Sequence, residues 1–384
     1  MALVHIVVAA VCALLGLAGA AYFGLCVWAA GRFRRQAKRA VHADFAPPVS
    51  VLKSLKGIDR HMYDAFCSHC RFDYDEYELL FGVSDRNEPA LELVIRLQQE
   101  FPERVIRVVE CPLELGMNGK VSTLAQMLPH AKYEHVLIND SDIVAPPDYL
   151  HRVMRWFADE RVGMVTSLYR GLAGKTIPSR MEALGINTDF MGGVLVAREM
   201  EDGVHFALGA TMAISKAVLR QIGGLEALVD YLGDDYELGA RTSAAGYRVE
   251  LADVVVETAV PDYTFGQFWS HQMRWARNNK HLRTEQYFGL IVTFGLAGAI
   301  LAVIAAPQAW WTWAAFATVA ATRLAAVVAI GRGVLNDPNV LRDLWLVPAR
   351  DFAALAVWLV SLAGNEVEWR GMKFRVRDGK LERL

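Results

Sequence analysis

Acidic residues stand at three places where apolar runs of the sequence end. Asp85 follows YELLFGVS, Asp140 and Asp142 follow HVLIN, and the third group lies in DYLGDDYELG, which contains Asp235. Aspartate is common in turns and at helix starts, so any one group alone would indicate only a polar turn. Two carboxylates on one short loop can hold Mg²⁺ or Mn²⁺ while phosphate oxygens fill the other coordination positions. Asp140 and Asp142 are therefore candidate metal ligands, and Asp235 is a candidate general base.

Two lysines are candidates for binding phosphate. Lys53 ends the apolar stretch VSVLK, and Lys120 follows GMNG, where a helix is predicted to begin. Backbone N–H groups at the start of a helix and a nearby ammonium group both attract phosphate. The alternative for each is an ordinary solvated lysine.

The segment from residue 45 to 286 is predicted to be an α/β domain with a mainly parallel sheet. Short apolar runs alternate with helical patterns, and several runs are apolar on both faces, as in buried parallel strands. In such sheets, ligands bind beyond the carboxyl ends of the strands, so we expect the acidic groups to converge there. Strands are expected over 49–53, 77–83, 104–110 and 134–139, and helices over 88–101 and 120–131.

The N-terminal segment is predicted to be a membrane anchor, residues 1–31. Residues 2–30 contain no Asp, Glu, Lys or Arg and are long enough to span a bilayer. A cleaved signal peptide is the alternative, but positive charge is missing before the apolar run. The basic cluster that follows places the next domain on the cytoplasmic side by the positive-inside rule. This cluster consists of Arg32, Arg34, Arg35, Lys38 and Arg39.

A C-terminal membrane region is expected over residues 287–384. Residues 287–306 and 309–330 are predicted to be two spanning helices. The third apolar stretch, 344–364, contains Pro348, Arg350 and Asp351, which are costly in lipid. Three crossings would also put the basic tail outside, against the charge rule, so we expect a re-entrant or interfacial final segment. The protein is therefore predicted to be multi-pass.

The overall charge gives no indication of a nucleic-acid partner. The chain has 40 basic and 42 acidic residues, a formal net charge of -2, and 54% of its residues are hydrophobic. A basic field of the kind that attracts nucleic acid is therefore absent. No protein partner is indicated either. The five cysteines form no repeated framework, which fits a reducing compartment.

The stretch FWSHQMRWARNNK, residues 268–280, carries the most specific local motif. Gln-x-x-Arg-Trp marks membrane-bound family 2-type glycosyltransferases, and Arg274 and Trp275 match its end. Gln272 stands one residue too late, and His271 occupies the glutamine position. The alternative is a basic, aromatic helix resting at a membrane interface, where Trp and Arg are enriched.

Taken in order, these stretches resemble the ceramide glucosyltransferase family of 21/2-like glycosyltransferases, most closely its bacterial relatives associated with hopanoid biosynthesis. The likeness covers nearly the whole chain. It implies a GT-A-type nucleotide-sugar-binding domain, inverting single displacement, a UDP-sugar donor and a lipid alcohol as acceptor. The matching stretches are PPVSVLKSLKG, GMNGKVSTLAQM, DSDIVAPPDYL, ALGINTDFMGGVLVAR, FALGATMAISK, GDDYELG and MRWARNN.

The resemblance also implies a role for each candidate residue. Asp85 would contact the uridine, Asp140 and Asp142 would form the metal and diphosphate site, and Asp235 would be the base. The Arg-Trp pair would brace the diphosphate and the acceptor. The two lysines and Gln272 would help to bind the donor.

The expected reaction moves N-acetylglucosamine from its UDP-sugar to a bacteriohopane polyol at the bacterial inner membrane. The alternatives are a ceramide glucosyltransferase, a processive polysaccharide synthase, and a noncatalytic membrane module that has kept the fold for binding. The sequence leaves the sugar, the lipid and the oligomeric state open.

Overall fold

The computed structural model describes residues 2–39, 45–59, 61–369 and 372–384, and the chain divides into two compact units. The sheet unit comprises Val41–Leu172, Met200–Pro261 and Phe374–Leu384, and the helical unit comprises Met1–Ala40, Ala173–Glu199 and Asp262–Lys373. Both units are therefore built from discontinuous segments. Residues 173–199 and 262–286, expected in the catalytic domain, belong to the helical unit, and residues 374–384, expected in the membrane region, belong to the sheet unit.

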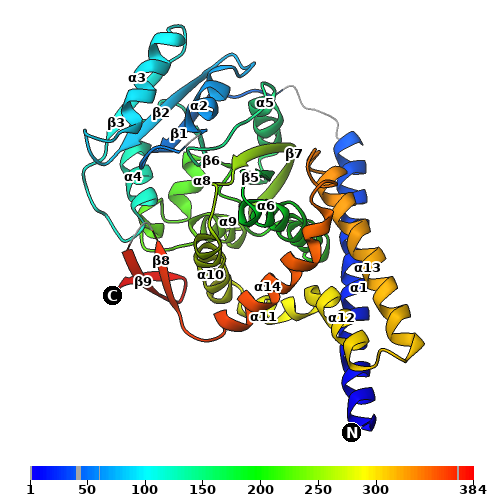
Figure 1. Ribbon diagram of the computed structural model, residues 1–384. Helices are drawn as coiled ribbons and strands as arrows, with labels where there is room; N and C mark the ends of the chain where they lie inside the picture. Colours follow the sequence, from blue (N-terminus) through cyan, green and yellow to red (C-terminus); the bar gives the residue numbers. More distant parts are fainter. Residues whose placement is uncertain (1, 40–44, 60, 370–371) are drawn as a thin grey trace. The chain divides into compact units, whose positions relative to one another are not determined.

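The sheet unit is built on one seven-stranded sheet (Figure 1) with the strand order β3-β2-β1-β4-β6-β5-β7. β6 runs antiparallel to both of its neighbours, and the other pairs are parallel. The mainly parallel sheet predicted from the sequence is confirmed, with all four expected strands in place. The strands are β1 (Val49–Ser54), β2 (Tyr77–Val83), β3 (Ile106–Glu110), β4 (His135–Ile138), β5 (Val162–Leu172), β6 (Met212–Ser215) and β7 (Arg248–Ala259).

Helices cover the sheet, which explains why its strands are apolar on both faces. Every residue of β2 is buried. A Cβ atom added at Gly82 of β2 would lie 2.3 Å from Met127 Sδ of α4, so the glycine lets this helix approach the strand closely. The helices of the sheet unit are α2 (Met62–Cys70), α3 (Ala90–Glu100), α4 (Gly119–Met127), α5 (Tyr149–Met154), α8 (Lys216–Gln221) and α9 (Asp234–Ala244).

The order in which the strands are added to the sheet reverses at β1. It adds β2 and β3 on one side of β1 and then returns to place β4 on the other side. In open α/β sheets, the carboxyl ends of the strands at such a reversal are where ligands bind. Lys53 lies at the end of β1 and Asp140 follows β4, so the topology brings two candidate residues to this point.

The C-terminal residues Phe374–Leu384, here called the C-terminal strap, form a hairpin within the sheet unit. Its strands β9 (Met372–Arg377) and β10 (Lys380–Arg383) pair antiparallel. Asp378 and Gly379 form the turn with φ values of 49° and 77°. Positive φ at both central residues is the geometry of the tight hairpin turns that favour Asp-Gly.

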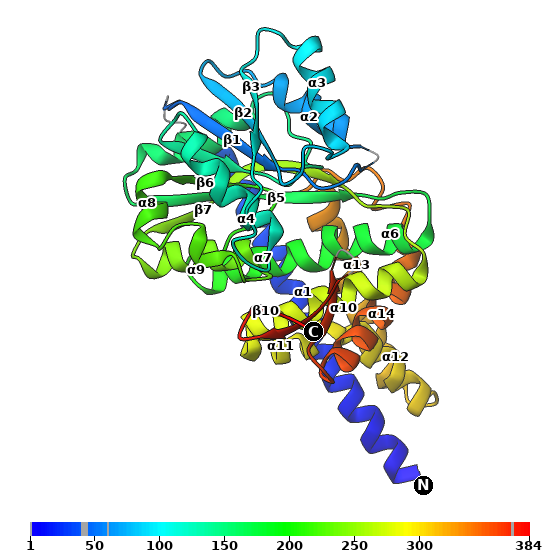
Figure 2. The same cartoon turned by 90° about the vertical axis from the view of Figure 1, so that its left-hand side faces the viewer.

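The helical unit contains the apolar helices. Four helical spans of its described residues are long and apolar enough to cross a membrane: Leu3–Ala37, Thr284–Ala305, Trp310–Arg332 and Leu344–Ser361. α1 packs against α12 and α13 (Figures 1 and 2), and α14 packs against α6, α10 and α12. The helices are α1 (Ala2–Arg39), α6 (Ile177–Leu184), α7 (Met191–Met200), α10 (Phe265–Leu282), α11 (Thr284–Gly289), α12 (Gly295–Ala305), α13 (Trp310–Val327) and α14 (Val347–Ser361); the short strand β8 (Glu366–Trp369) follows α14.

Glycines let α1 and α12 approach each other closely. A Cβ atom at Gly19 would lie 2.4 Å from the Cα atom of Gly295, and one at Gly16 would lie 3.2 Å from Ala299. Helices in lipid gain little from hydrophobic burial against one another, so they associate through close packing at small residues. The contact at Gly19 therefore holds α1 against α12.

We expect Gly19→Ala to destabilise the helical unit, because the added methyl group meets backbone that cannot rotate away. The overpacking should cost about 1–3 kcal/mol. Gly24→Ala, on the same helix, is the matched control, since a Cβ atom there meets nothing within 4 Å. Thermal denaturation of both variants in detergent measures the difference. Equal stability of the two variants would contradict the close contact.

Candidate active site

Lys53 fixes the loop that carries the Asp-x-Asp pair. Its side chain is only 1% exposed, and its Nζ donates a hydrogen bond to the backbone oxygen of Asp140 at 3.0 Å. Burial lowers the pKa of Lys53 to about 7, and the carboxylates of Asp142 and Asp140 oppose this shift. An anionic ligand near the loop would favour the charged ammonium form of Lys53, and contact of Lys53 with the donor stays a prediction.

Lys120 links the same loop to helix α9. It lies in the first turn of α4, whose N-cap Asn118 accepts a hydrogen bond from Val121 N through its side chain. Lys120 Nζ lies 2.8 Å from Asp140 Oδ1 and 3.2 Å from Asp234 Oδ2. Burial disfavours its charged form, but these carboxylates outweigh burial and raise the pKa of Lys120 above its ordinary value. Lys120 therefore stays an ammonium between the two acidic groups.

Asp235 lies in the first turn of α9 and is held by two backbone groups. Its Oδ2 accepts a hydrogen bond from Gly209 N at 2.9 Å, and its Oδ1 accepts one from Tyr236 N at 2.8 Å. Burial and the neighbouring Asp234 raise the pKa of Asp235 to about 6, against the effect of Lys120. A carboxylate that titrates near neutral pH is suited to accept a proton in a reaction.

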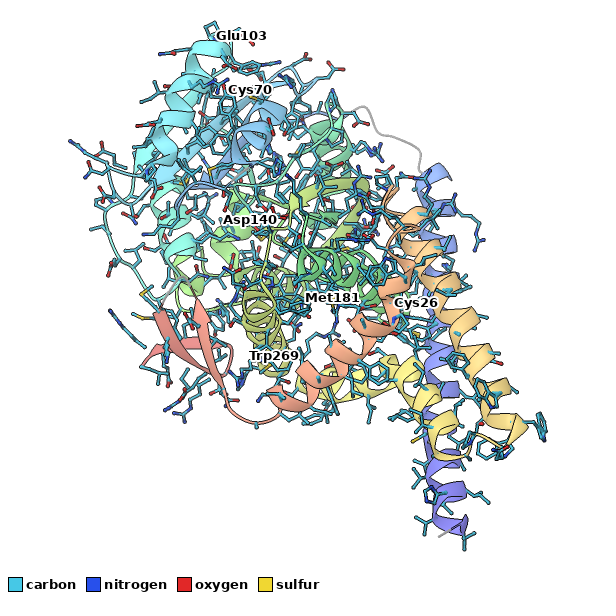
Figure 3. The ribbon with its side chains drawn as sticks, in the orientation of Figure 1. Cys26, Cys70, Glu103, Asp140, Met181 and Trp269 are labelled. Carbon is cyan, nitrogen blue, oxygen red and sulfur yellow. The ribbon has the colours of Figure 1, made fainter. Side chains whose placement is uncertain are left out.

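Gly209 brings the predicted metal loop and the predicted base together. A Cβ atom added there would lie 3.3 Å from Asp140 Oδ2 and 3.3 Å from Asp235 Oδ2. Both carboxylates therefore face the same glycine, in the part of the sheet unit where Figure 3 labels Asp140. The sequence gives no sign of this role for Gly209, because a glycine in a short apolar stretch is also common in strand turns.

Asp142 is turned toward the end of β7. Thr258 of β7 donates a hydrogen bond from its hydroxyl to Asp142 Oδ2. Burial and Asp140 raise the pKa of Asp142, since a second negative charge on the same loop disfavours ionisation. A positive charge placed at this loop would relieve that repulsion.

The donor set fits a divalent ion that is bound together with phosphate. Among the described residues, no three His, Cys, Asp or Glu side chains form a cluster that could hold a metal by themselves. Asp140 and Asp142 nevertheless supply the hard oxygen donors that Mg²⁺ and Mn²⁺ prefer, and Mg²⁺ is commonly held by one or two carboxylates plus substrate phosphates. The site also has an excess of negative charge that a divalent ion would balance. Its charged groups are Asp140, Asp142, Asp234 and Asp235 against Lys53 and Lys120.

Asp85 lies at the same edge of the sheet, after β2, which pairs with β1. Its side chain is exposed, and its Oδ1 accepts hydrogen bonds from the backbone N and the side-chain Nδ2 of Asn87 at 2.8 and 3.2 Å. This is a side-chain turn of the kind that aspartate commonly forms. Contact of Asp85 with a uridine stays a prediction.

Gln272, Arg274 and Trp275 lie on α10, which belongs to the helical unit, whereas the carboxylates belong to the sheet unit. Helix α10 begins at a complete capping box formed by Thr264 and Gln267. The Trp275 ring packs edge-on against Phe190 at a centroid distance of 5.4 Å. The roles of the Arg-Trp pair remain predictions from the motif.

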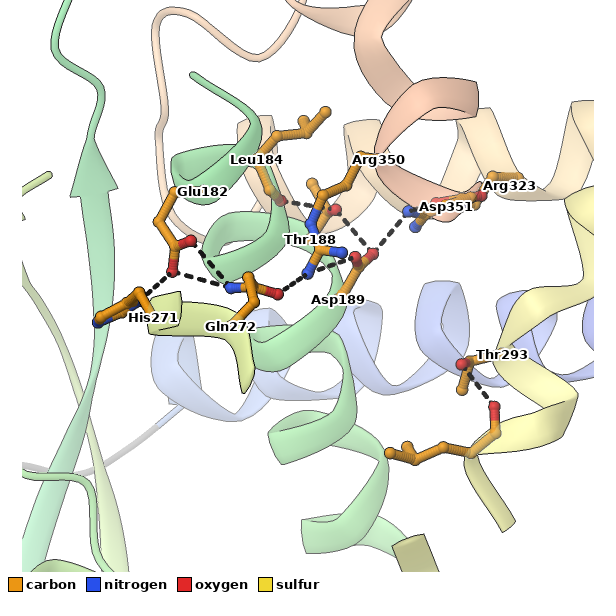
Figure 4. A network of polar contacts seen from close by, with 11 residues as sticks. Glu182, Leu184, Thr188, Asp189, His271, Gln272, Thr293, Arg323, Arg350 and Asp351 are labelled. Atoms are coloured by element: carbon orange, nitrogen blue, oxygen red, sulfur yellow. Dashed lines mark hydrogen bonds and ion pairs between the residues drawn. The ribbon is translucent and has the colours of Figure 1, made fainter. Parts of the chain in front are cut away.

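A buried polar network surrounds Gln272 (Figure 4). Its Nε2 donates to both carboxylate oxygens of Glu182 at 3.0 and 2.9 Å, and its Oε1 accepts from Arg350 at 3.3 Å. His271 Nδ1 lies 3.1 Å from the same Glu182 carboxylate. The sequence did not indicate Glu182, because it stands 90 residues from Gln272 in a helix without a recognisable motif.

The same network explains the charged residues of the third apolar stretch. Arg350 also lies 3.7 Å from Asp189, and Asp351 pairs with Arg323 at 2.7 Å. Ionisable groups in apolar helices are expected to face the protein interior and to pair with one another. Arg350 and Asp351 do so, and therefore do not meet lipid as unpaired charges.

A model of one known family, Glycosyl transferase family 21, matches residues 8–382. The chain belongs to glycosyl transferase family 21. This family 21 glycosyltransferase is 23% identical over 349 residues to ceramide glucosyltransferase 1 of Caenorhabditis elegans, covering 87% of this chain and 72% of that relative. It is 23% identical over 232 residues to ceramide glucosyltransferase 3 of the same organism, covering 60% of this chain and 50% of that relative. The family resemblance predicted from the sequence is confirmed.

A solved structure confirms the fold. The mannosyltransferase PcManGT from Pyrobaculum calidifontis, in complex with GDP-Man and Mn²⁺, matches with a TM-score of 0.52 and 19% sequence identity, covering 92% of this chain and 99% of that chain. The likeness supports the GT-A-type fold expected from the sequence. The metal and nucleotide sugar are those of the mannosyltransferase.

Proposed function

We propose that this family 21 glycosyltransferase moves a single sugar from a UDP-sugar to the hydroxyl group of a membrane lipid, with glucose and ceramide as the substrates. The observation that carries the proposal is the pair of carboxylates at Gly209, in which Asp235 lies beside the Asp-x-Asp loop. The names of the relatives support ceramide as the acceptor. They give no support to the N-acetylglucosamine and hopanoid specificity expected from the sequence, so ceramide replaces the hopanoid as the leading candidate.

The donor would bind at the carboxyl ends of β1 and β4. Lys53 and Lys120 would contact the diphosphate, and Asp85 would contact the uridine. Asp140 and Asp142 would hold Mg²⁺ or Mn²⁺ against the diphosphate oxygens, which fits their side-chain chemistry. When bound, the ion would stabilise the negative charge that develops on the departing diphosphate.

In the transfer step, Asp235 would remove the proton from the acceptor hydroxyl. The acceptor oxygen would form a bond to C1 of the sugar while the bond from C1 to the diphosphate oxygen breaks, so UDP leaves and the configuration at C1 inverts. The pKa of Asp235, raised to about 6, suits this role because the carboxylate is ionised at neutral pH and still basic enough to take the proton. Arg274 and Trp275 would brace the diphosphate and the acceptor.

The C-terminal strap supports a topology for the apolar segments. It belongs to the sheet unit, as does β7, which comes before the C-terminal helices in the chain, so we expect the chain between β7 and the strap to cross a membrane an even number of times. Among the described residues, Leu344–Ser361 is the shortest and least apolar of the four spans, 18 residues with a mean hydropathy of 1.4, and it carries Arg350 and Asp351, which are costly in lipid. We therefore propose that α14 is the segment that does not cross. The basic cluster after residue 31 supports a cytoplasmic sheet unit, at an inner membrane if the source is bacterial.

The purified protein in detergent tests the proposal directly. It would be incubated with Mg²⁺ or Mn²⁺ and labelled UDP-glucose or UDP-N-acetylglucosamine, each offered with ceramide and with bacteriohopanetetrol. Glucosylated ceramide is the expected product. An N-acetylglucosaminyl hopanoid would move the specificity to the other lipid class, a polymer would indicate a processive synthase, and binding of UDP-sugar without any transfer would indicate a binding module.

A further inference from the structure

The loop just before α9, residues 229–232, is held on one side by the loop that starts α4. Asn118 N donates to Val229 O at 2.6 Å, and Asn118 Nδ2 donates to Tyr231 O at 2.8 Å. Met117 N donates to Asp230 Oδ1 at 3.0 Å. Asn118 also caps α4, the helix that carries Lys120. These hydrogen bonds therefore connect residues 229–232 to the proposed diphosphate site.

The C-terminal strap holds the same loop through two backbone hydrogen bonds. Leu381 N donates to Asp230 O at 2.7 Å, and Leu232 N donates to Gly379 O at 3.2 Å. The strap is itself fixed by apolar side chains that are buried: Phe374, Val376 and Leu381. The last residues of the chain thus act as a strand along the loop that leads into α9.

The ring of Tyr231 extends this contact to α9 itself. Lys380 Nζ of the strap and the Arg241 guanidinium of α9 each lie 5.3 Å from its ring centroid. Cations at this distance from an aromatic face are attracted to it, by about 0.5–1 kcal/mol at exposed sites. The strap therefore contacts both the loop and, through Tyr231, the helix that begins with the proposed base.

The start of α9 has no side-chain cap, although Gly209 N and Lys120 contact the carboxylates of its first turn. Its N-cap is Gly233, which makes no side-chain capping hydrogen bond, and Asp234 and Asp235 follow directly. A helix start without a side-chain cap takes its position from the chain that precedes it. Here that chain is the loop held by the strap.

We propose that the C-terminal strap is a positioning element for the general base, and that the hydrogen bond from Leu381 N to Asp230 O sets the place of Asp235 relative to the Asp-x-Asp loop. The proposal rests on the proposed function, in which Asp235 takes the acceptor proton. Displacement of a catalytic group by about 1 Å can cost about a hundredfold in rate, so a contact remote from the chemistry can have a large effect.

Leu381→Pro and Leu381→Ala separate the two contributions of this residue. Along each strand of an antiparallel pair, successive residues point their N–H groups alternately toward and away from the partner strand. Leu381 N–H bonds Asp230, so it points away from β9, and proline removes that bond without removing a bond of the hairpin. Alanine keeps the N–H group but loses the buried side chain. The exposed Glu382 of the same strand provides a surface control, Glu382→Ala.

Steady-state kinetics with saturating lipid and varied UDP-glucose, together with melting temperatures, test the proposal. Leu381→Pro should lower kcat about tenfold to a hundredfold, with the KM for UDP-glucose and UDP binding unchanged. Leu381→Ala should keep kcat near that of wild type even where its melting temperature falls. A Leu381→Pro protein with wild-type kcat, or a Leu381→Ala protein that loses kcat as much as Leu381→Pro does, would overturn the positioning role.

Asp235→Asn, assayed in parallel, distinguishes the two proposals. If Asp235→Asn is active, the base is assigned wrongly and the proposed function fails at that point. If Asp235→Asn is inactive and Leu381→Pro is fully active, the proposed function stands and the strap is not a positioning element.

Discussion

Asp235→Asn is expected to lower the rate of sugar transfer by about 10²–10⁴-fold while leaving UDP-sugar binding intact. The amide keeps the size of the side chain but cannot accept the acceptor proton, and a positioned general base contributes about 10²–10⁴-fold to rate. The donor contacts proposed here involve Lys53, Lys120 and the Asp-x-Asp loop, which this variant leaves unchanged. Initial rates with labelled UDP-glucose, and calorimetric titration with UDP, measure the two properties separately.

Glu237→Gln is the matched control for this variant. Glu237 lies on the same helix and pairs with Arg241 at 3.4 Å. The Glu237→Gln substitution therefore removes a negative charge from α9 outside the proposed site. It should retain a rate close to that of wild type. Transfer that is lost equally in both variants would show that α9 tolerates no loss of charge, and would remove the special role of Asp235.

The same assignment predicts the pH dependence of the wild-type enzyme. Because the pKa of Asp235 is raised to about 6, its carboxylate is protonated below that pH and cannot act as a base. The value of kcat/KM should therefore fall by about tenfold per pH unit below about pH 6. A flat profile across this range would place the base elsewhere.

Asp142→Asn is expected to weaken divalent-metal binding in the presence of UDP. The variant removes one proposed metal ligand. Loss of a group that only orients a metal ligand lowers metal affinity by about 10–100-fold, so loss of the ligand itself should lower it at least as much. Activity should fall at low Mn²⁺ and recover in part at high Mn²⁺. Electron paramagnetic resonance titration of Mn²⁺ with UDP present measures the affinity without relying on turnover.

Asp148→Asn controls for the loss of negative charge in this segment. Asp148 follows the same loop, its side chain is 58% exposed, and it pairs with Arg152 at 3.4 Å. It should bind Mn²⁺ with UDP as wild type does. Equal Mn²⁺ affinity in Asp142→Asn and in wild type would exclude Asp142 as a ligand.

Local features of the sequence were sufficient to predict the elements that carry the site. The runs VSVLK, YELLFGV, RVIRVVE and EHVLIN became β1 to β4, because short apolar runs between turn residues have few other stable arrangements in a soluble fold. The α3 range was also predicted closely, since its apolar positions recur with the helical period. These elements predict the parallel sheet and the edge of that sheet at which Asp85, Asp140 and Lys53 lie.

The division into units was not visible in the sequence. Apolar length alone predicted the N-terminal helix, the two C-terminal spanning helices and a further apolar stretch, but residues 173–199 belong to the same unit although they contain polar residues such as Glu182. Glu182 is acceptable there because Gln272 and His271 satisfy its carboxylate. A buried charge depends on partners that come from elsewhere in the chain, and composition cannot reveal them.

The family, the fold class, the apolar helices and the order of the acidic groups can be predicted from the sequence, because each of these depends on local pattern or on motif order. Three contacts become visible in the folded chain alone: Asp140 and Asp235 face the same glycine, Lys120 lies between Asp140 and Asp234, and the basic tail is a strand beside the loop before α9. These contacts join residues far apart along the chain. They arise from packing and from the pairing of buried charges, which no single stretch of sequence contains.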